Sequence, residues 1–277
     1  MFRFFCITLL CIIGLWIIRE KSISRYMIRK NRKKIIKNKR ILTYNIQRLP
    51  YSTKPLNVLK TLIRDHSIVL LQECFCNIFY DDIEYHFPEY NIIKGSMNGY
   101  RLINSGLVLL SKYPILNYYF RSFSSQRYLS ADVLAEKGFI IALIQFGIHK
   151  IYIINTHLQS SIYRNDDEVA LLQWKELYEH LNTLEYPWII GGDFNLNYSK
   201  ILNHINPYYI YSTLTPSIYI QYDENHKELD TSCIYKEGYD GFGFDYFITH
   251  RISLESPITI PFTYSDHAPV MSTIIKK

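Results

Sequence analysis

Short apolar runs, most of them ending in a polar residue, dominate the chain from residue 41 onward. These runs are rich in Ile, Val, Tyr and Phe, the residues that favour buried strands. We therefore predict strands at residues 41–46, 67–73, 105–111, 138–146, 150–157, 187–194 and 244–249. Polar side chains at the ends of such strands come together easily at one rim of a sheet.

Two stretches have the spacing of helices instead, residues 53–65 and 164–185. The second begins with three acidic residues, which suit the positive end of a helix. Its apolar positions near one face are Val169, Leu172, Trp174, Leu177 and Leu181. With no internal repeat and no low-complexity linker after residue 41, we predict one layered α/β catalytic domain over residues 41–277.

The N-terminus has a different pattern, because residues 4–18 read FFCITLLCIIGLWII without a charge. No small-residue cleavage site follows this run, so we predict a retained single-pass membrane anchor at residues 1–18. The alternative is a signal peptide whose removal would accompany secretion.

Residues 19–40 form a basic juxtamembrane segment. Twelve of the 31 Lys and Arg residues and one of the 25 acidic residues lie in residues 1–40, which therefore carry +11. By the positive-inside rule, we predict that the segment and the catalytic domain after it lie on the cytoplasmic side. The segment could lie on anionic lipid headgroups, or it could be a solvated linker helix.

The rest of the chain has 19 basic and 24 acidic residues, a net charge of −5. This balance argues against a domain that grips long stretches of duplex DNA, because such domains carry a basic face of their own. A hydrophobic fraction of 48% also excludes disorder over most of the chain. The five cysteines offer no disulfide framework, and we predict that Cys74 and Cys76 are buried or half-buried thiols.

Polar residues stand at or just after the predicted strands, and together they form one set of catalytic groups. Carboxylates, carboxamides and two histidines are the groups needed for in-line attack of water on phosphorus. They are Asn45, Glu73, His157, Asp193, Asn195, Asp245, Asp266 and His267.

Within this set, the hard oxygen ligands Glu73 and Asp266 suit Mg²⁺, with Mn²⁺ as a second candidate. His267 and Asp245 form a candidate pair in which the carboxylate fixes the tautomer of a histidine that accepts a proton from water.

Six of these motifs, in this order and spacing, resemble the endonuclease/exonuclease/phosphatase superfamily of deoxyribonuclease I. They are YNIQ at 44–47, LQE at 71–73, THLQ at 156–159, GGDFN at 191–195, FDYF at 244–247 and SDHAPV at 265–270. The resemblance covers residues 41 to about 275. It implies a four-layer α/β sandwich, two packed mixed sheets flanked by helices, with a metal-dependent site at one rim.

The resemblance also implies roles. Asn45 and Glu73 would hold the metal, with Asp266 as a further candidate ligand. Asn195 would contact the phosphoryl oxygens and His157 would stabilise charge on the phosphate. His267, oriented by Asp245, would act as general base or its electrostatic equivalent, and Asp193 would activate or orient the attacking water or serve the leaving group. The matching motifs leave the choice of base between Asp193 and His267 open.

Lys137-Gly138-Phe139 ahead of His157-Leu158-Gln159 is similar to neutral sphingomyelinases. This similarity implies a Mg²⁺-dependent phosphoric diester hydrolase that acts on a membrane phospholipid headgroup in the manner of sphingomyelinase C. The alternative is a nuclease or DNA-end phosphodiesterase, because tyrosyl-DNA phosphodiesterases have a similar His-Leu-Glu. A third alternative, an inactive interaction module, is disfavoured since each expected position holds a competent residue.

Overall fold

The computed structural model describes residues 36, 38–49, 52–75, 83–95, 103–126, 134–161, 163, 166–202, 209–213 and 215–275. The first sheet has seven strands within these residues, in the order β14-β16-β1-β2-β4-β3, with β15 beside β16. Its strands are β1 (Arg40–Arg48), β2 (Ile68–Cys74), β3 (Asn91–Lys94), β4 (Val108–Ser111), β14 (Ser253–Leu254), β15 (Ile258–Thr259) and β16 (Val270–Ile275). The β1–β2 pair is parallel and the other pairs are antiparallel, so the sheet is mixed.

The second sheet has six strands in the described part, in the order β5-β6-β7-β8-β13-β9. They are β5 (Ile115–Ser122), β6 (Gly138–Phe146), β7 (His149–His157), β8 (Trp188–Asp193), β9 (Tyr209–Tyr211) and β13 (Asp245–His250). A small third sheet contains β10 (Ile218–Tyr222), β11 (Glu228–Ser232) and β12 (Asp240–Phe242).

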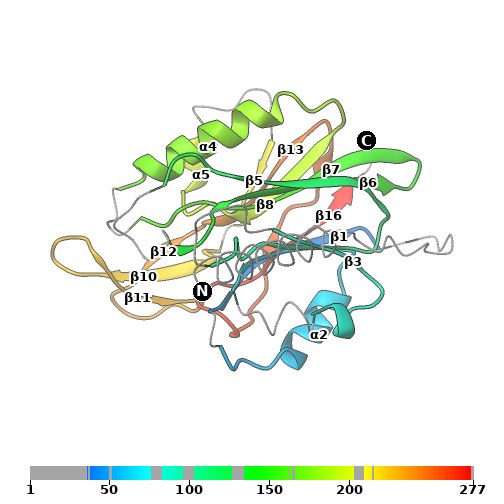
Figure 1. Cartoon of the computed structure of the whole chain (residues 1–277). Helices are drawn as coiled ribbons and strands as arrows, with labels where there is room; N and C mark the ends of the chain where they lie inside the picture. Colours follow the sequence, from blue (N-terminus) through cyan, green and yellow to red (C-terminus); the bar gives the residue numbers. More distant parts are fainter. Residues whose placement is uncertain are drawn as a thin grey trace, which may run out of the picture. The chain divides into compact units, whose positions relative to one another are not determined.

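The two large sheets pack face to face, with helices on their outer faces. Helices α4 (Glu168–Leu181) and α5 (Tyr198–Leu202) lie over the second sheet, and α2 (Asn57–Arg64) lies under the first (Figure 1). One apolar cluster fills the space between the sheets, and it includes Leu70, Ile140 and Phe247. Another lies between the second sheet and α4. The predicted four-layer α/β sandwich is confirmed.

Both predicted helices are present but shorter than predicted. The first begins at Asn57 rather than at residue 53, two residues after Pro55. The second covers Glu168–Leu181 rather than 164–185, and its buried residues include Trp174 and Leu177. Leu172 was wrongly placed on the buried face, because 47% of its surface is exposed. The neighbouring Gln173 is buried instead, and its side-chain oxygen accepts a hydrogen bond from the backbone N–H of Gln159 in the loop after β7.

The N-terminal predictions fall outside this structure. The anchor at residues 1–18 lies outside the described residues, and so does nearly all of the basic segment at 19–40. In the part of the chain that is described, no helix is both long and apolar enough to cross a bilayer. Of the two cysteines singled out, Cys74 is buried as predicted and Cys76 lies outside the described residues.

Candidate active site

Three neighbouring strands of the second sheet bring three predicted site residues into one row. His157 at the end of β7 is in register with Asp193 at the end of β8, and Asp193 is in register with Asp245 at the start of β13. The preceding Gly192 lets β8 approach β7 this closely, since a Cβ there would collide with the Thr156 carbonyl oxygen. The GGDFN motif therefore supplies both the carboxylate and the space it needs.

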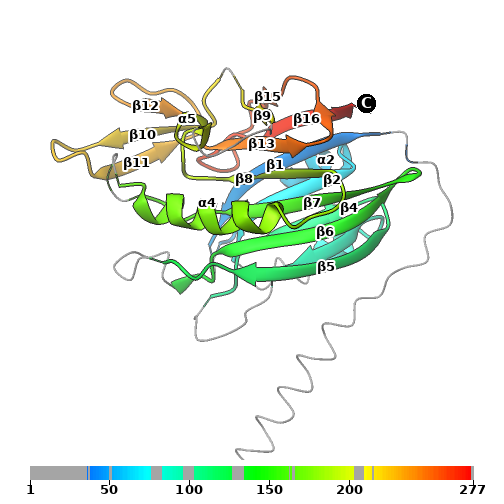
Figure 2. The ribbon, with the colours of Figure 1, turned by 90° about the horizontal axis from the view of Figure 1, so that it is seen from above.

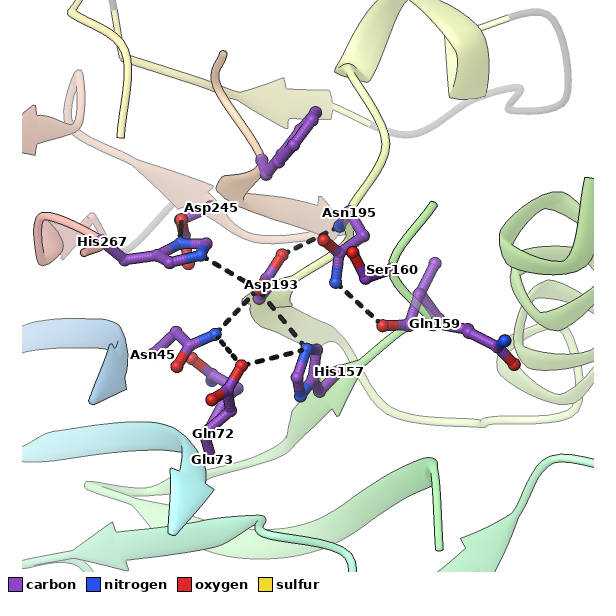
Figure 3. A network of polar contacts seen from close by, with 12 residues as sticks. Asn45, Gln72, Glu73, His157, Gln159, Ser160, Asp193, Asn195, Asp245 and His267 are labelled. Carbon is purple, nitrogen blue, oxygen red and sulfur yellow. Dashed lines mark hydrogen bonds and ion pairs between the residues drawn. The ribbon is translucent and has the colours of Figure 1, made fainter. Parts of the chain in front are cut away.

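The first sheet contributes Asn45 from β1 and Glu73 from β2. The Asn45 carboxamide nitrogen donates to Glu73 Oε1 at 2.9 Å and to Asp193 Oδ2 at 3.0 Å, so this one group joins the two sheets (Figure 3). Glu73 has a φ of 54°, in the left-handed region that residues with a Cβ rarely adopt. Such strain is typical of functional sites, where the surrounding structure holds a residue in place.

His267 lies in the loop before β16, and its ring faces Asp245 and Asp193 of this row. Its Nδ1 is 2.6 Å from Asp245 Oδ2, and its Nε2 is 3.6 Å from Asp193 Oδ2. The first contact holds Nδ1 as the donor, which leaves Nε2 directed at the centre of the site. The structure thus brings together the His267–Asp245 pair that the sequence predicted.

His157 lies between the two sheets' contributions. Its Nε2 is 3.5 Å from Asp193 Oδ2 and 4.0 Å from Glu73 Oε1. The Nζ of Lys137 lies 2.9 Å from the same ring nitrogen and 3.3 Å from the Leu158 carbonyl oxygen. Burial first, and the Lys137 ammonium second, lower the pKa of His157 well below its ordinary value. His157 is therefore neutral at physiological pH.

Asn195 and Asp266 complete the predicted set at its edges. Asn195 has a φ of 47°; its backbone N–H donates to Asp193 Oδ1 at 2.9 Å and its side chain to the Leu158 carbonyl oxygen at 3.0 Å. Asp266 accepts hydrogen bonds from Thr231 Oγ1 at 2.6 Å and Ser265 Oγ at 3.0 Å. Its charge contributes to a raised pKa at Glu73, so it acts on the centre electrostatically.

Buried carboxylates dominate the electrostatics of the centre. Burial raises the pKa of Asp193 to about 7; Asp245 adds to the effect and His267 opposes it. Burial likewise raises the pKa of Glu73. For His267, burial would lower the pKa, but the Asp245 and Asp193 carboxylates outweigh it and hold that pKa well above its ordinary value. Burial therefore disfavours the charged forms of both Asp193 and Glu73, and a cation bound beside them would favour the carboxylates again.

This donor set fits a hard divalent cation. Glu73 is partly exposed, and the Asn45 amide donates both to its carboxylate and to that of Asp193, which also accepts from the Asn195 backbone N–H. Carboxylate and carboxamide oxygens are the ligands that Mg²⁺ and Mn²⁺ prefer. Ligand atoms of Asp193, Asp245 and His267 also lie within 4.8 Å of one another. That trio suits proton transfer better, because the 2.6 Å bond already occupies His267 Nδ1 and one Asp245 oxygen.

A buried hydrogen bond between Gln72 and Asn155 joins the two sheets beside the site, and neither residue was among the predicted site residues. Gln72 Nε2 donates to Asn155 Oδ1 at 2.7 Å, and Asn155 Nδ2 donates to the carbonyl oxygens of Leu71 and Val108 at 2.9 Å. Gln72 and Asn155 directly precede Glu73 and the Thr156-His157 pair in the chain. The bridge therefore fixes the spacing of the sheets where the site residues emerge.

The match to a family model agrees with the fold and the geometry. The model described as the endonuclease/exonuclease/phosphatase family matches residues 42–267, which contain every residue of the site. The chain belongs to this family.

Two curated relatives match a shorter stretch. The chain is similar to "Sphingomyelin phosphodiesterase 5" of Danio rerio, with 31% identity over 117 residues, and to "Sphingomyelinase C 2" of Leptospira interrogans, with 27% identity over 116 residues. These alignments cover 37% and 35% of this chain. They span only 21% and 18% of the relatives' own lengths.

Several solved structures match over most of the chain. Beta toxin from Staphylococcus aureus superposes with a TM-score of 0.62 at 19% identity, covering 85% of this chain and 99% of that one. TDP2 of D. rerio, complexed with a single-strand DNA product, superposes with a TM-score of 0.64 at 15% identity, covering 86% and 98%. At these identities the structures establish the shared fold.

Proposed function

We propose that the chain is a divalent-metal-dependent phosphodiesterase that hydrolyses a phospholipid headgroup in the manner of sphingomyelinase C. The convergence of the buried His267–Asp245 pair on Asp193, opposite the Asn45–Glu73 pair, carries the proposal. This arrangement combines a proton acceptor with oxygen ligands for a cation, and it does so within a few ångströms of one carboxylate. Hydrolysis of a phosphodiester by water needs both parts.

In the proposed reaction, His267 takes the proton from the attacking water through Nε2. Asp245 holds the ring in the tautomer that this requires and stabilises the imidazolium that forms. Asp193 orients the water, since its Oδ2 lies 3.6 Å from His267 Nε2. His157, held neutral beside Lys137, and Asn195 face the phosphoryl oxygens. Asn195 has a second amide N–H to donate to the charge that develops there, and the Lys137 ammonium beside His157 adds positive charge.

Glu73 and Asn45 would hold the metal ion, with Asp266 close enough to act on Glu73 through its charge. A bound divalent cation would supply positive charge to the phosphoryl oxygens and would lower the pKa of the neighbouring carboxyl groups and of His267. One of the similar solved structures, a beta toxin variant, has bound magnesium ions, which supports Mg²⁺ as the first metal to test.

Two observations favour a lipid substrate. Both curated relatives named above are sphingomyelin-directed by name, and the Lys137-Gly138 segment that resembles neutral sphingomyelinases places its lysine against His157. The net charge of −5 over residues 41–277 also disfavours a surface built for a polyanion. We further propose that residues 1–18 hold this domain at a membrane on the cytoplasmic side; extraction of the full chain by detergent but not by alkaline carbonate would support the anchor.

A DNA-end phosphodiesterase is the second candidate. The similarity to TDP2 in complex with a single-strand DNA product favours it, because that fold superposes as well as the beta toxin fold does. Fold and metal site do not by themselves choose a substrate.

The deciding experiment is hydrolysis by the full chain in detergent or vesicles, with Mg²⁺ or with EDTA. Sphingomyelin vesicles, single- and double-stranded DNA and a 5′-tyrosyl oligonucleotide are the substrates. We expect metal-dependent phosphocholine release, reversibly abolished by EDTA, and no cleavage of DNA. Release of tyrosine from the oligonucleotide without lipid turnover would establish the second candidate instead.

A further inference from the structure

A cavity of about 250 Å³ opens beside Asn195, on the side of the site away from His267. Ser160 and Ser161, which follow β7, and Lys200 on α5 form one wall. The close-up shows Ser160 next to Asn195 (Figure 3). The small sheet β10–β11–β12 lies beside α5 and forms the opposite wall (Figure 2). A group bonded to a phosphate held at Asn195 would enter this cavity.

Three partly exposed aromatic side chains line the opposite wall: Tyr222, Phe242 and Phe244. The rings of Phe242 and Phe244 are stacked, with centroids 5.0 Å apart and planes at 22°. Tyr222 meets Phe242 edge-on, with centroids 6.2 Å apart and planes at 82°. The rings therefore present faces in two directions over a buried Ile220. Ring faces carry negative charge density and attract cations, above all weakly hydrated quaternary ammonium groups.

The charged residues of the cavity also favour a cation. Lys200 Nζ is ion-paired with Asp167, so its charge is neutralised within the wall. Glu228 lines the cavity as well and is in register with Tyr222 across β10 and β11. Among the described lining residues, two carboxylates therefore stand against one ammonium group. A second phosphate of a nucleic acid would meet the Glu228 carboxylate in this cavity.

The geometry points to this cavity as the subsite for the quaternary ammonium end of a zwitterionic phosphodiester headgroup, of which phosphocholine is the test case. The inference rests on the proposed function, since it takes the phosphate to lie at Asn195. Tyr222, Phe242 and Phe244 contact the trimethylammonium group, and Glu228 supplies the countercharge. The three rings thereby select a choline headgroup over one that lacks a cation.

Two soluble esters test the subsite without a membrane. One is p-nitrophenyl phosphorylcholine; the other is its 3,3-dimethylbutyl isostere, which has the same shape and no positive charge. We expect the full chain to favour the choline ester in kcat/KM, and Phe242→Leu to lower kcat/KM for that ester about tenfold with the isostere changed less than about twofold. Leu keeps most of the apolar volume at this position and removes the ring face, together with the ring contacts to Phe244 and Tyr222. Glu228→Gln is expected to act in the same direction.

Matched controls come from the same small sheet. Tyr219 is on the opposite face of β10 from Tyr222 and packs against Tyr235 instead, so Tyr219→Leu should leave the preference between the esters unchanged. Glu224→Gln removes one exposed carboxylate without touching the cavity. The melting temperature of each variant shows whether it is folded.

The outcomes separate the two proposals. The subsite would be overturned by equal losses on both esters in the Phe242 and Glu228 variants, or by a wild type without preference for the choline ester. Headgroup release from sphingomyelin would in that case still support the proposed function. A wild type that cleaves tyrosyl-DNA and no choline ester would overturn both. In that case, a loss of DNA-end cleavage in Phe242→Leu would identify the rings as a stacking surface for a base.

Discussion

The two sides of the site are built differently. On the His267 side, a 2.6 Å hydrogen bond joins two fully buried groups, Asp245 and the imidazole, that come from a strand and a loop packed in the core. On the Glu73 side, the carboxylate is partly exposed, stands on a left-handed backbone and has a single amide as its side-chain donor. The first side is preorganised for proton transfer, and the second has carboxylate oxygens that can still bind a cation. Asp193 lies between them and contacts both.

Removing the histidine should break the first side with the largest effect. We expect His267→Ala to lower kcat roughly a thousandfold or more, because it removes the proton acceptor. Asp193→Ala, which removes the carboxylate shared by both sides, should cost as much. Initial rates at saturating substrate, with the exposed His226→Ala as control, measure both effects. Near-normal turnover in a folded variant would remove that residue from the mechanism.

Removing the carboxylate of the second side should change metal dependence as well as rate. We expect Glu73→Gln to lower activity about a hundredfold and to raise the Mg²⁺ concentration for half-maximal activity at least tenfold. His267→Ala should leave metal binding within about threefold of wild type, as measured by Mn²⁺ titration. Equal metal affinities in the two variants would contradict the division of labour between the sides.

Loosening the bridge beneath both sides should affect stability more than chemistry. Asn155→Leu leaves Gln72 and two backbone carbonyl oxygens without their buried partner. We expect a loss of about 2–4 kcal/mol in the free energy of unfolding, measured by urea denaturation. Gln145→Leu is the matched control, because Gln145 lies on the neighbouring strand and its side chain donates to the exposed carbonyl oxygens of Gly147 and His149. A loss below 1 kcal/mol in Asn155→Leu would mean that water replaces the bridge.

His66, which lies outside the site, shows how burial changes the pKa of a histidine without the effect that Asp245 has on His267. Buried His66 contacts the Leu62 carbonyl oxygen and has no hydrogen-bonded carboxylate, so burial lowers its pKa. The unfolded chain then binds the proton more readily, near pH 6.5, and stability must fall as the pH drops below that value. We expect His66→Gln to reduce this fall by about 1 kcal/mol between pH 7 and pH 5. An unchanged pH dependence would mean that burial does not lower the pKa of His66 in the fold.

The sequence-based predictions succeeded where the residue types of a segment determine its structure without contacts from elsewhere. Continuous runs of Ile and Val favour buried strands by their composition alone, so β6, β7 and β8 were predicted within one or two residues of their bounds. Helix ends and short edge strands such as β14 and β15 depend on contacts made elsewhere, and these were missed or misplaced. Lys137 was noticed in a motif, but its contact with His157 depends on the pairing of β6 with β7.

The order of six polar motifs at strand ends, which the sequence alone contains, determined the family, the fold and the membership of the site. Only the tertiary structure decided which groups touch. Asp193 and Asn45 are 148 residues apart in the chain, and they meet because two sheets pack face to face. The Gln72–Asn155 bridge and the aromatic cavity beside Asn195 exist for the same reason. Hydrogen bonds and cation–π contacts act over a few ångströms, and such distances between remote residues are set by packing.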